Sequence, residues 1–174
     1  DQYVLNGGNA IVFADPLSLM DDPRMGAGGS VPDNLFKAWG ITMEAGKAVA
    51  DFSYATRLRN RNNQVEENPM WLSVQPGAFN ADNLITANLE SMLLPVAGVI
   101  EVLPDTPHTI EPLIQSSPNN AIVEAFSHNM DVRALRRDFK PSGTVRNLAV
   151  RISGTFKTAF PEGKPEAKAN PDDS

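Results

Sequence analysis

Three aspartates near the start of the chain carry the oxygen atoms that a hard cation prefers. Asp15 is followed by the adjacent pair Asp21 and Asp22, and Ser30 comes soon after. Carboxylate oxygens suit Mg²⁺ or Ca²⁺, but this spacing matches no calcium-binding loop. We therefore interpret Asp15, Asp21, Asp22 and Ser30 as a candidate ligand loop that is acidic and solvated, and we expect neither a metal nor a cofactor.

A glycine-rich run overlaps that loop. Gly26, Gly28 and Gly29 lead to Ser30, which is followed by Val31. A phosphate-binding P-loop requires a lysine and then a serine or threonine after its last glycine, so the run resembles a phosphate cradle only superficially. The composition favours a mobile loop instead.

Nucleophilic catalysis has few candidates in this sequence. Ser116 and Ser117 are adjacent, and the two histidines, His108 and His128, form no ligand-spaced pair. No Gly-x-Ser-x-Gly elbow surrounds either serine, and the absence of cysteine removes thiolate chemistry and disulfides. We expect both histidines at the surface and no catalytic site. A hydrolase that uses the loop after Asp15 remains an alternative.

A cluster of cations lies on one side of the clearest predicted helix, which spans residues 131–139. A helical turn takes about 3.6 residues, so the apolar residues Val132, Leu135 and Phe139 share the face that turns inward. The opposite face carries the cations Arg133, Arg136, Arg137 and Lys140. This arginine stripe is a candidate partner surface for anionic lipid headgroups or an acidic protein, and a solvated helix face is the alternative.

The predicted fold is built around residues 6–16. A glycine pair ends a short helix over residues 1–5, and an uninterrupted apolar run, Ala10–Ala14, leads into the acidic loop. A run without polar alternation is typical of a strand buried on both faces of a parallel sheet. We therefore predict that Ala10–Ala14 is an interior parallel strand flanked by a helix over Asp33–Trp39. The acidic loop would then follow the sheet edge at which open α/β proteins bind ligands.

Further elements follow from local patterns. The strands that we expect are Lys47–Asp51, Phe52–Leu58, Met70–Val74, Val99–Leu103, Thr109–Gln115 and Ala121–Phe126, with a short helix or turn over Ala81–Leu89. Residues 146–156 alternate between apolar and polar side chains, which predicts an antiparallel C-terminal strand with one buried face. Residues 161–174 have no apolar face to bury, so we expect a disordered tail after a single domain over residues 1–160.

Composition indicates a globular domain with an acidic surface. The chain has 174 residues, 41% of them hydrophobic, and a formal net charge of −6. A general nucleic-acid-binding protein needs a basic footprint, which this balance argues against. No apolar run approaches the roughly 20 residues that span a bilayer, and we expect no signal peptide within these residues. Because the sequence opens inside a predicted helix, we expect an excised piece of a longer protein.

Several blocks of the sequence resemble one bacterial family. They are DQYVLNGG with the residues that follow it as far as Pro16, LFKAWGITMEAGKAVAD (35–51), ITANLES (85–91), PLIQSSP (112–118) and LRRDFKPSGTVRNLAVRISGTFKTAFPEG (135–163). In this order they are similar to the extracytoplasmic auxiliary component of certain bacterial ABC transporters. That component is of the gliding-motility G type and is often described as an uncharacterised ABC transport system.

The resemblance implies an α/β fold related to the class I glutamine amidotransferases, with a partly parallel sheet and flanking helices but without the catalytic cysteine of that class. It implies a non-enzymatic auxiliary or binding domain in the periplasm, anchored to the inner membrane in the full-length protein. The implied partners are the permease and ATPase of the transporter and the membrane surface. No catalytic residue carries over. A sugar- or polymer-binding module is a further alternative, which exposed aromatic residues would favour; we expect Trp39 and Trp71 in the core.

Overall fold

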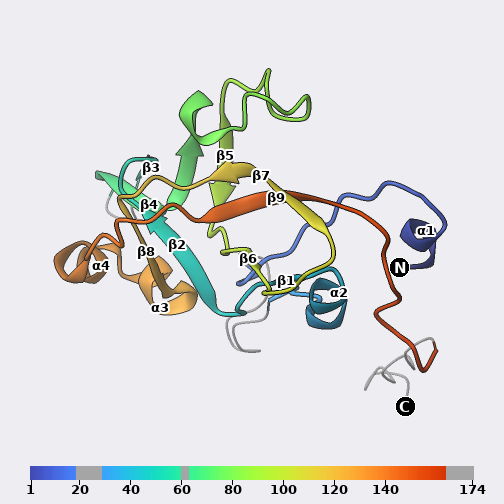
Figure 1. Cartoon of the computed structure of the whole chain (residues 1–174). Helices are drawn as coiled ribbons and strands as arrows, with labels where there is room; N and C mark the ends of the chain where they lie inside the picture. The colour runs from blue at the N-terminus through green and yellow to red at the C-terminus, as the bar shows by residue number, and fades with distance from the viewer. Residues whose placement is uncertain (19–28, 60–62, 164–174) are drawn as a thin grey trace, which may run out of the picture.

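Small antiparallel sheets organise the chain (Figure 1). The computed structural model describes residues 1–18, 29–59 and 63–163. Within these residues the sheets pair β1 (Ile41–Thr42) with β6 (Glu101–Val102), β2 (Lys47–Asp51) with β8 (Asn120–Glu124), and β7 (Thr109–Gln115) with β9 (Asn147–Ser153). The largest sheet joins β3 (Ala55–Arg59), β4 (Val65–Val74) and β5 (Met92–Pro95). The helices are α1 (Gln2–Leu5), α2 (Asp33–Ala38), α3 (Ala125–Met130) and α4 (Val132–Asp138), and the 3₁₀ turn η2 covers Pro76–Ala78.

Single backbone contacts join these sheets to one another. The amide of Val49 in β2 donates to the carbonyl of Ala97 at 2.8 Å, and Val96 donates to Met70 in β4 at 2.7 Å. An isolated bridge pairs Phe79 with Ile114 in β7. These contacts tie the segments after η2 and β5 to β7, β4 and β2, so the narrow sheets are linked through the residues between their strands.

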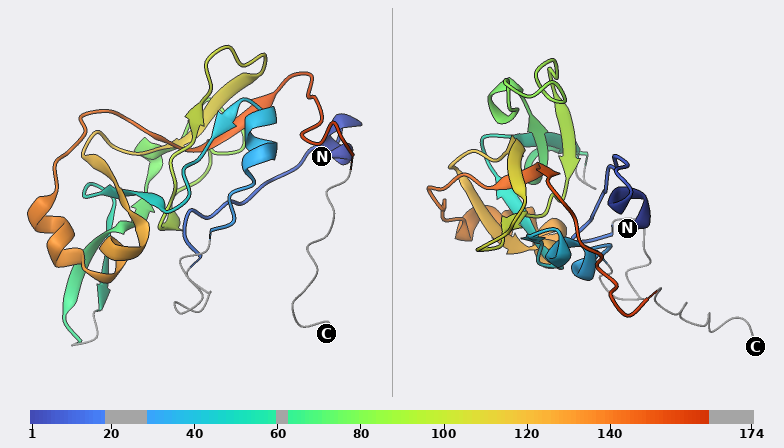
Figure 2. Two further views of the ribbon diagram at one scale, coloured as in Figure 1. Left: turned by 90° about the horizontal axis from the view of Figure 1, so that it is seen from below. Right: turned by 45° about the vertical axis from the view of Figure 1, so that its right-hand side comes forward.

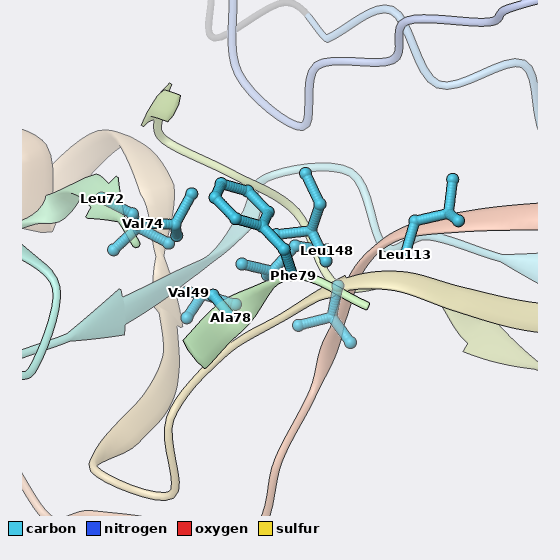
Figure 3. Close-up of a cluster of buried hydrophobic side chains, with 9 residues drawn as sticks. Val49, Leu72, Val74, Ala78, Phe79, Leu113 and Leu148 are labelled. Atoms are coloured by element: carbon cyan, nitrogen blue, oxygen red, sulfur yellow. The ribbon is translucent and has the colours of Figure 1, made fainter. Parts of the chain in front are cut away.

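Strand β2 is the centre of that body because its two faces pack into different cores. Val49 faces the first core cluster with Leu72, Val74 and Phe79 (Figure 3). Ala48 and Ala50, on the opposite face, belong to the second cluster with Met70 and Leu135. Burial on both faces explains why the sequence of β2 is apolar without alternation. The prediction of a strand at Lys47–Asp51 is confirmed with the same bounds.

The predicted parallel sheet is not found in this structure. Every strand pair among the described residues is antiparallel. The C-terminal strand is confirmed in type, since β9 pairs antiparallel with β7 and buries Leu148. The fold is therefore mixed α/β, with short helices placed around small antiparallel sheets (Figure 2).

The prediction of a buried strand at Ala10–Ala14 is wrong for this structure. The segment belongs to no strand, and the side chains of Ile11 and Phe13 are 85% and 87% exposed. None of its backbone groups hydrogen-bonds to another described residue. Of its side chains, Ala14 packs against the third core cluster, formed by Phe36, Ile41 and Met43. An apolar run can be buried on both faces only if strands lie beside it, and none of the described strands does.

The two ends of the described chain meet. The Asp1 carboxylate accepts hydrogen bonds from the Thr158 hydroxyl at 2.7 Å and the Ala159 amide at 2.9 Å. As Figure 1 shows, α1 lies beside the C-terminal segment and away from the sheets. Residues 161–163 form a turn, and the rest of the predicted tail lies outside the described residues.

The expectation of a surface position for His108 is wrong. Its side chain is 8% exposed, and the imidazole stacks on the Phe156 ring with centroids 4.7 Å apart. Trp39, buried as expected, packs against the same Phe156 ring in an edge-to-face arrangement, with ring centroids 5.4 Å apart. The C-terminal segment thus closes over the end of α2 by aromatic packing.

Candidate functional site

Two adjoining grooves follow the β2–β8 ribbon, and Lys47 and Ile122 line both of them. The first groove, of about 360 Å³, lies between β8 and α4. The second, of about 370 Å³, runs toward α2 and β1. Sequence reasoning missed both grooves, because they form only when β8 pairs with β2 and α4 packs behind it.

The register of β2 and β8 determines where the backbone amide and carbonyl of Ile122 point. Val49 pairs with Ile122, but the Val49 amide donates to Ala97 instead. In an antiparallel ladder this makes the pair a non-hydrogen-bonded one, so the amide and carbonyl of Ile122 point away from β2. The groove continues over Leu135, Phe139 and Lys140 of the α4 region. It therefore combines an apolar floor with charges of both signs, since Lys47, Lys140, Glu124 and Asp138 all line it.

The second groove carries charges of both signs. Its lining includes Asp33, Glu44 and Glu101 together with the cations Lys37 and Lys47. Lys47 forms an ion pair with Glu124, and that hydrogen bond raises the pKa of the Lys47 ammonium group. A groove without a single dominant sign is suited to a polar, peptide-like ligand rather than to a strongly anionic one.

Asp51 and Ser117 form a buried polar network at the end of β2. The fully buried Asp51 carboxylate accepts from the Ser117 amide at 2.7 Å and from the Ser117 hydroxyl at 2.8 Å. It also accepts from the amide of Ser53 at 2.9 Å. The network fastens the loop after β7 to the turn after β2.

Asn120 extends this network to the start of β9. Its side-chain amide donates to the Ser116 hydroxyl at 3.1 Å and to the Thr144 carbonyl at 2.6 Å. The Ser116 hydroxyl oxygen accepts from the Arg146 amide at 2.9 Å. Sequence reasoning named the serines but missed Asp51 and Asn120. The available signal was the position of Asp51 at the end of an apolar strand, because a carboxylate buried there requires hydrogen-bond partners.

Neither serine meets a histidine among the described residues. The hydroxyl of Ser117 donates to Asp51, and the hydroxyl of Ser116 donates to the Ser117 carbonyl at 3.1 Å. His108 packs on Phe156 instead, and the His128 side chain lies outside the described part of the chain. The described residues therefore do not assemble a Ser-His-Asp arrangement.

The candidate ligand loop is closed at its base. The Asp15 amide donates to the Ser30 hydroxyl at 3.0 Å, and the Ser30 amide donates to the Asp15 carbonyl at 2.8 Å. Gly29 allows this approach, since a Cβ there would lie 2.8 Å from the Pro16 carbonyl oxygen. Asp21 and Asp22 and most of the predicted mobile loop lie outside the described residues. Within the described residues no group of three or more acidic or histidine side chains is placed to hold a metal ion.

The three arginines of the arginine stripe lie on α4 and Lys140 follows its end, and the guanidinium groups have partners within the chain. Arg133 and Arg136 form ion pairs of 3.5 and 3.6 Å with neighbouring glutamates of β4, Glu66 and Glu67. Arg136 also lies over the Phe52 ring, 5.2 Å from its centroid.

The C-terminal end of the stripe differs from its start. Arg137 pairs with Asp138 at 3.0 Å, a contact that raises the pKa of the guanidinium group. Lys140 forms no ion pair with the described residues and lines the first groove. Arg133 and Arg136 therefore join α4 to β4, whereas Lys140 lines the first groove beside Asp138.

Comparison with known proteins identifies the family. The family model described as "ABC-type uncharacterized transport system" matches residues 1–174, the whole chain. The chain belongs to this family. It is an auxiliary component of an ABC transport system, as the sequence blocks predicted. No curated protein and no solved structure matches the chain.

Membership of this auxiliary family associates the chain with an ABC transport system but assigns no residue a role. Among the residues that the structure describes, no helix is long and apolar enough to cross a membrane. The β2–β8 grooves and the arginine stripe are thus the features from which a role for this auxiliary component is argued below.

Proposed function

We propose that this chain is a non-catalytic binding domain of an ABC transport system, located outside the cytoplasmic membrane and held near the inner membrane by the full-length protein. Its partners in this proposal are the permease and ATPase subunits, with the arginine stripe facing them or the membrane surface. The resemblance of the sequence blocks supports a transport system related to gliding motility.

The observation that carries a binding rather than a catalytic role is the use made of Ser116 and Ser117. Both hydroxyls are donors in the buried network around Asp51 and Asn120. In a Ser-His-Asp site the nucleophilic serine is hydrogen-bonded to a histidine base. Neither serine has such a partner among the described residues, and their hydroxyls instead link the loops around Asp51 and Asn120. The grooves beside β8 and the ion-paired face of α4, in contrast, are open to solvent.

The partner surface can be tested by charge reversal with a matched rescue. Arg133→Glu combined with Arg136→Glu places four carboxylates together, because Glu66 and Glu67 already lie opposite. Surface pairs contribute about 0.2–1 kcal/mol each, so we expect a folded but somewhat destabilised domain. We expect its recovery with proteoliposomes that contain the permease and ATPase to fall, as it should for the wild type when salt is raised.

The rescue separates a partner contact from an internal one. Adding Glu66→Lys and Glu67→Lys to the reversed variant restores attraction between α4 and β4 while positions 133 and 136 of the stripe stay negative. If the stripe binds a partner, this variant regains stability but not recovery. If recovery returns together with stability, the stripe acts only within the chain and the proposed partner surface is wrong.

Enzyme activity provides a separate test of the non-catalytic role. Ester, phosphoester and amide substrates should be turned over at background rates. Turnover that disappears on Ser116→Ala, Ser117→Ala or Asp15→Asn would replace the proposal with a hydrolase.

The exposed segment Ala10–Ala14 supports a finer proposal about the fold. We propose that it enters a parallel, amidotransferase-like sheet when the domain is part of the longer membrane-anchored protein. Its apolar side chains on both faces and its unpaired backbone groups are the features that such a strand requires. Hydrogen exchange at these amides should be fast in this chain and at least about 100-fold slower in the longer protein. Equally fast exchange in both would contradict the proposal.

A further inference from the structure

The turn between η2 and β5 presents two large aliphatic side chains to solvent. Leu84 is 93% exposed and Ile85 is 60% exposed. In Figures 1 and 2 the segment between η2 and β5 projects away from the sheets. We refer to residues 80–90 as the Leu84 loop.

Hydrogen bonds within the loop fix its conformation. The Asn83 side-chain oxygen accepts from the Ile85 amide at 3.0 Å. The Asn83 carbonyl accepts from the amides of Thr86 and Ala87 at 3.0 and 2.8 Å. The Thr86 hydroxyl donates to the Asn80 carbonyl at 2.7 Å. Asn83 and Thr86 are themselves buried, so the residues on either side of the exposed pair hold the turn together from inside through their hydrogen bonds.

The loop is also fastened to the body. The amide of Asn80 donates to the Leu113 carbonyl and its side chain donates to the Pro112 carbonyl, both at 2.9 Å. At the other end Leu89 packs against the first core cluster. The exposed pair is therefore held rigidly at a fixed place relative to β7. Rigid apolar anchors lose little conformational freedom on binding, which is a property of strong docking contacts.

Charge around the exposed pair indicates what kind of surface it meets. The loop contains Asp82 and Glu90 and no lysine or arginine. Neither carboxylate has an ion-pair partner among the described residues. An anionic lipid surface would repel these groups, whereas a protein pocket with an apolar floor and a basic rim complements both the aliphatic pair and the acids.

We propose that the Leu84 loop inserts into an apolar pocket with a basic rim on a protein subunit of the ABC transport system. This inference rests on the proposed function, because it assigns a second contact surface to the same partner complex. It places the contact on the side chains of Leu84 and Ile85 and gives Asp82 and Glu90 the role of electrostatic guides.

Affinity measurements on matched variants test the docking contact. The probe is proteoliposomes reconstituted with the permease and ATPase subunits, compared with vesicles of the same lipids without protein. Leu84→Ser with Ile85→Ser should keep the far-ultraviolet circular dichroism and Tm of the wild type and weaken binding by at least about 30-fold, as loss of a hot spot does. Val65→Ser changes another exposed aliphatic residue, 61% exposed at the start of β4, and should bind like the wild type.

Site-specific labelling gives a second readout. The chain has no cysteine, so Leu84→Cys introduces one attachment point for an environment-sensitive fluorophore. Its emission should shift to shorter wavelength on the permease-containing vesicles and not on the protein-free ones. A label at Val65→Cys should not shift on either.

The outcomes separate the docking loop from the proposed function. Equal binding of the wild type and the double serine variant, without a shift at position 84, overturns the docking loop and leaves the proposed function standing. Binding of the wild type to neither vesicle type removes the proposed function and the loop with it. A shift and a loss of binding on protein-free vesicles assign the loop to lipid and overturn the protein pocket.

Discussion

Replacing Asp51 with alanine should destabilise the domain far more than any surface substitution. The carboxylate is fully buried and accepts three hydrogen bonds, two from Ser117 and one from Ser53. Alanine removes all three acceptors and leaves the donors behind. Since the network joins the end of β2 to the loops before β8, its loss should act on the cooperative unfolding of the whole domain.

The expected magnitude follows from the surroundings of each donor. A buried donor left without an acceptor costs about 1–3 kcal/mol, and both Ser117 groups lie in the partly buried network. Ser53 is exposed, so its amide can turn to water and contributes less. We expect a total of about 4 kcal/mol, and a fall in Tm of about 8–16 °C for a domain of this size.

Urea and thermal unfolding of three variants check this reasoning. Asp51→Asn keeps an acceptor oxygen but turns an NH₂ group toward a donor, so we expect about half the loss caused by alanine. Ser117→Ala removes one hydroxyl and should cost about 1–2 kcal/mol. Asp82→Ala, at an exposed aspartate, should stay within about 0.5 kcal/mol of the wild type. If Asp51→Ala lies within about 1 kcal/mol of that control, the network does not stabilise the fold as argued.

Three further predictions concern the core, an ion pair and alkaline pH. Leu72→Ala, at a fully buried position of the first core cluster, should lower the free energy of unfolding in urea by about 2–5 kcal/mol, because a cavity adds to the lost burial; a loss under about 1 kcal/mol would speak against a packed core there. A double-mutant cycle on Arg136 and Glu67, both largely exposed, should give a coupling of at most about 1 kcal/mol that shrinks in high salt. Burial and the charge of Asp51 raise the pKa of Tyr54 above its ordinary value of 10.0, so the folded state binds this proton more tightly than the unfolded state does. The free energy of unfolding should therefore fall as pH rises past about 10. Tyr54→Phe should therefore lose Tm less steeply than the wild type in that range, and parallel curves would contradict this assignment.

Elements specified by a local pattern were predictable from the sequence. Strands β2 and β7 have the bounds that their apolar and β-branched residues predicted. Helix α4 begins after Asp131, whose side chain accepts from the Ala134 amide at 2.9 Å as an N-cap. In these segments the nearest residues in sequence already determine the backbone, so no distant partner is needed to recognise them.

Strand β4 was only partly predictable because distant residues decide its start. Its first half contains Glu66, Glu67 and Pro69, a composition typical of a loop. Pairing with β3 accommodates the proline through a register shift, in which the partner changes from Leu72 at Ala55 to Asn68 at the next residue. A bulge of this kind leaves a residue without a ladder bond, and proline has no amide hydrogen to lose. The glutamates are then available to the arginines of α4.

The grooves beside β8 were beyond sequence reasoning for the same reason. Their walls come from segments about 80 residues apart in the chain, since Lys47 faces Glu124 across the ribbon. The outward orientation of the Ile122 amide and carbonyl follows from the Val49 amide donating to Ala97, a residue far from β8 in the sequence. Composition and periodicity describe one element at a time, so a site assembled between elements leaves no signature in either.

The error at Ala10–Ala14 shows what an apolar pattern does report. An apolar pattern indicates the environment that suits a segment, but it does not show that neighbouring strands are present to provide that environment. Burying the Ile11 and Phe13 side chains is worth about 1.5–3 kcal/mol each, and at 85% and 87% exposure nearly all of that free energy is unused in this structure. The same reasoning applies to Leu84, which is 93% exposed on a rigid turn. The segment and the turn differ in their backbone hydrogen bonds. No backbone group of Ala10–Ala14 bonds to another described residue, which suits a segment that completes a sheet. The amides of Ile85, Thr86 and Ala87 are already bonded within the turn, so the exposed side chains are what it offers to a docking partner.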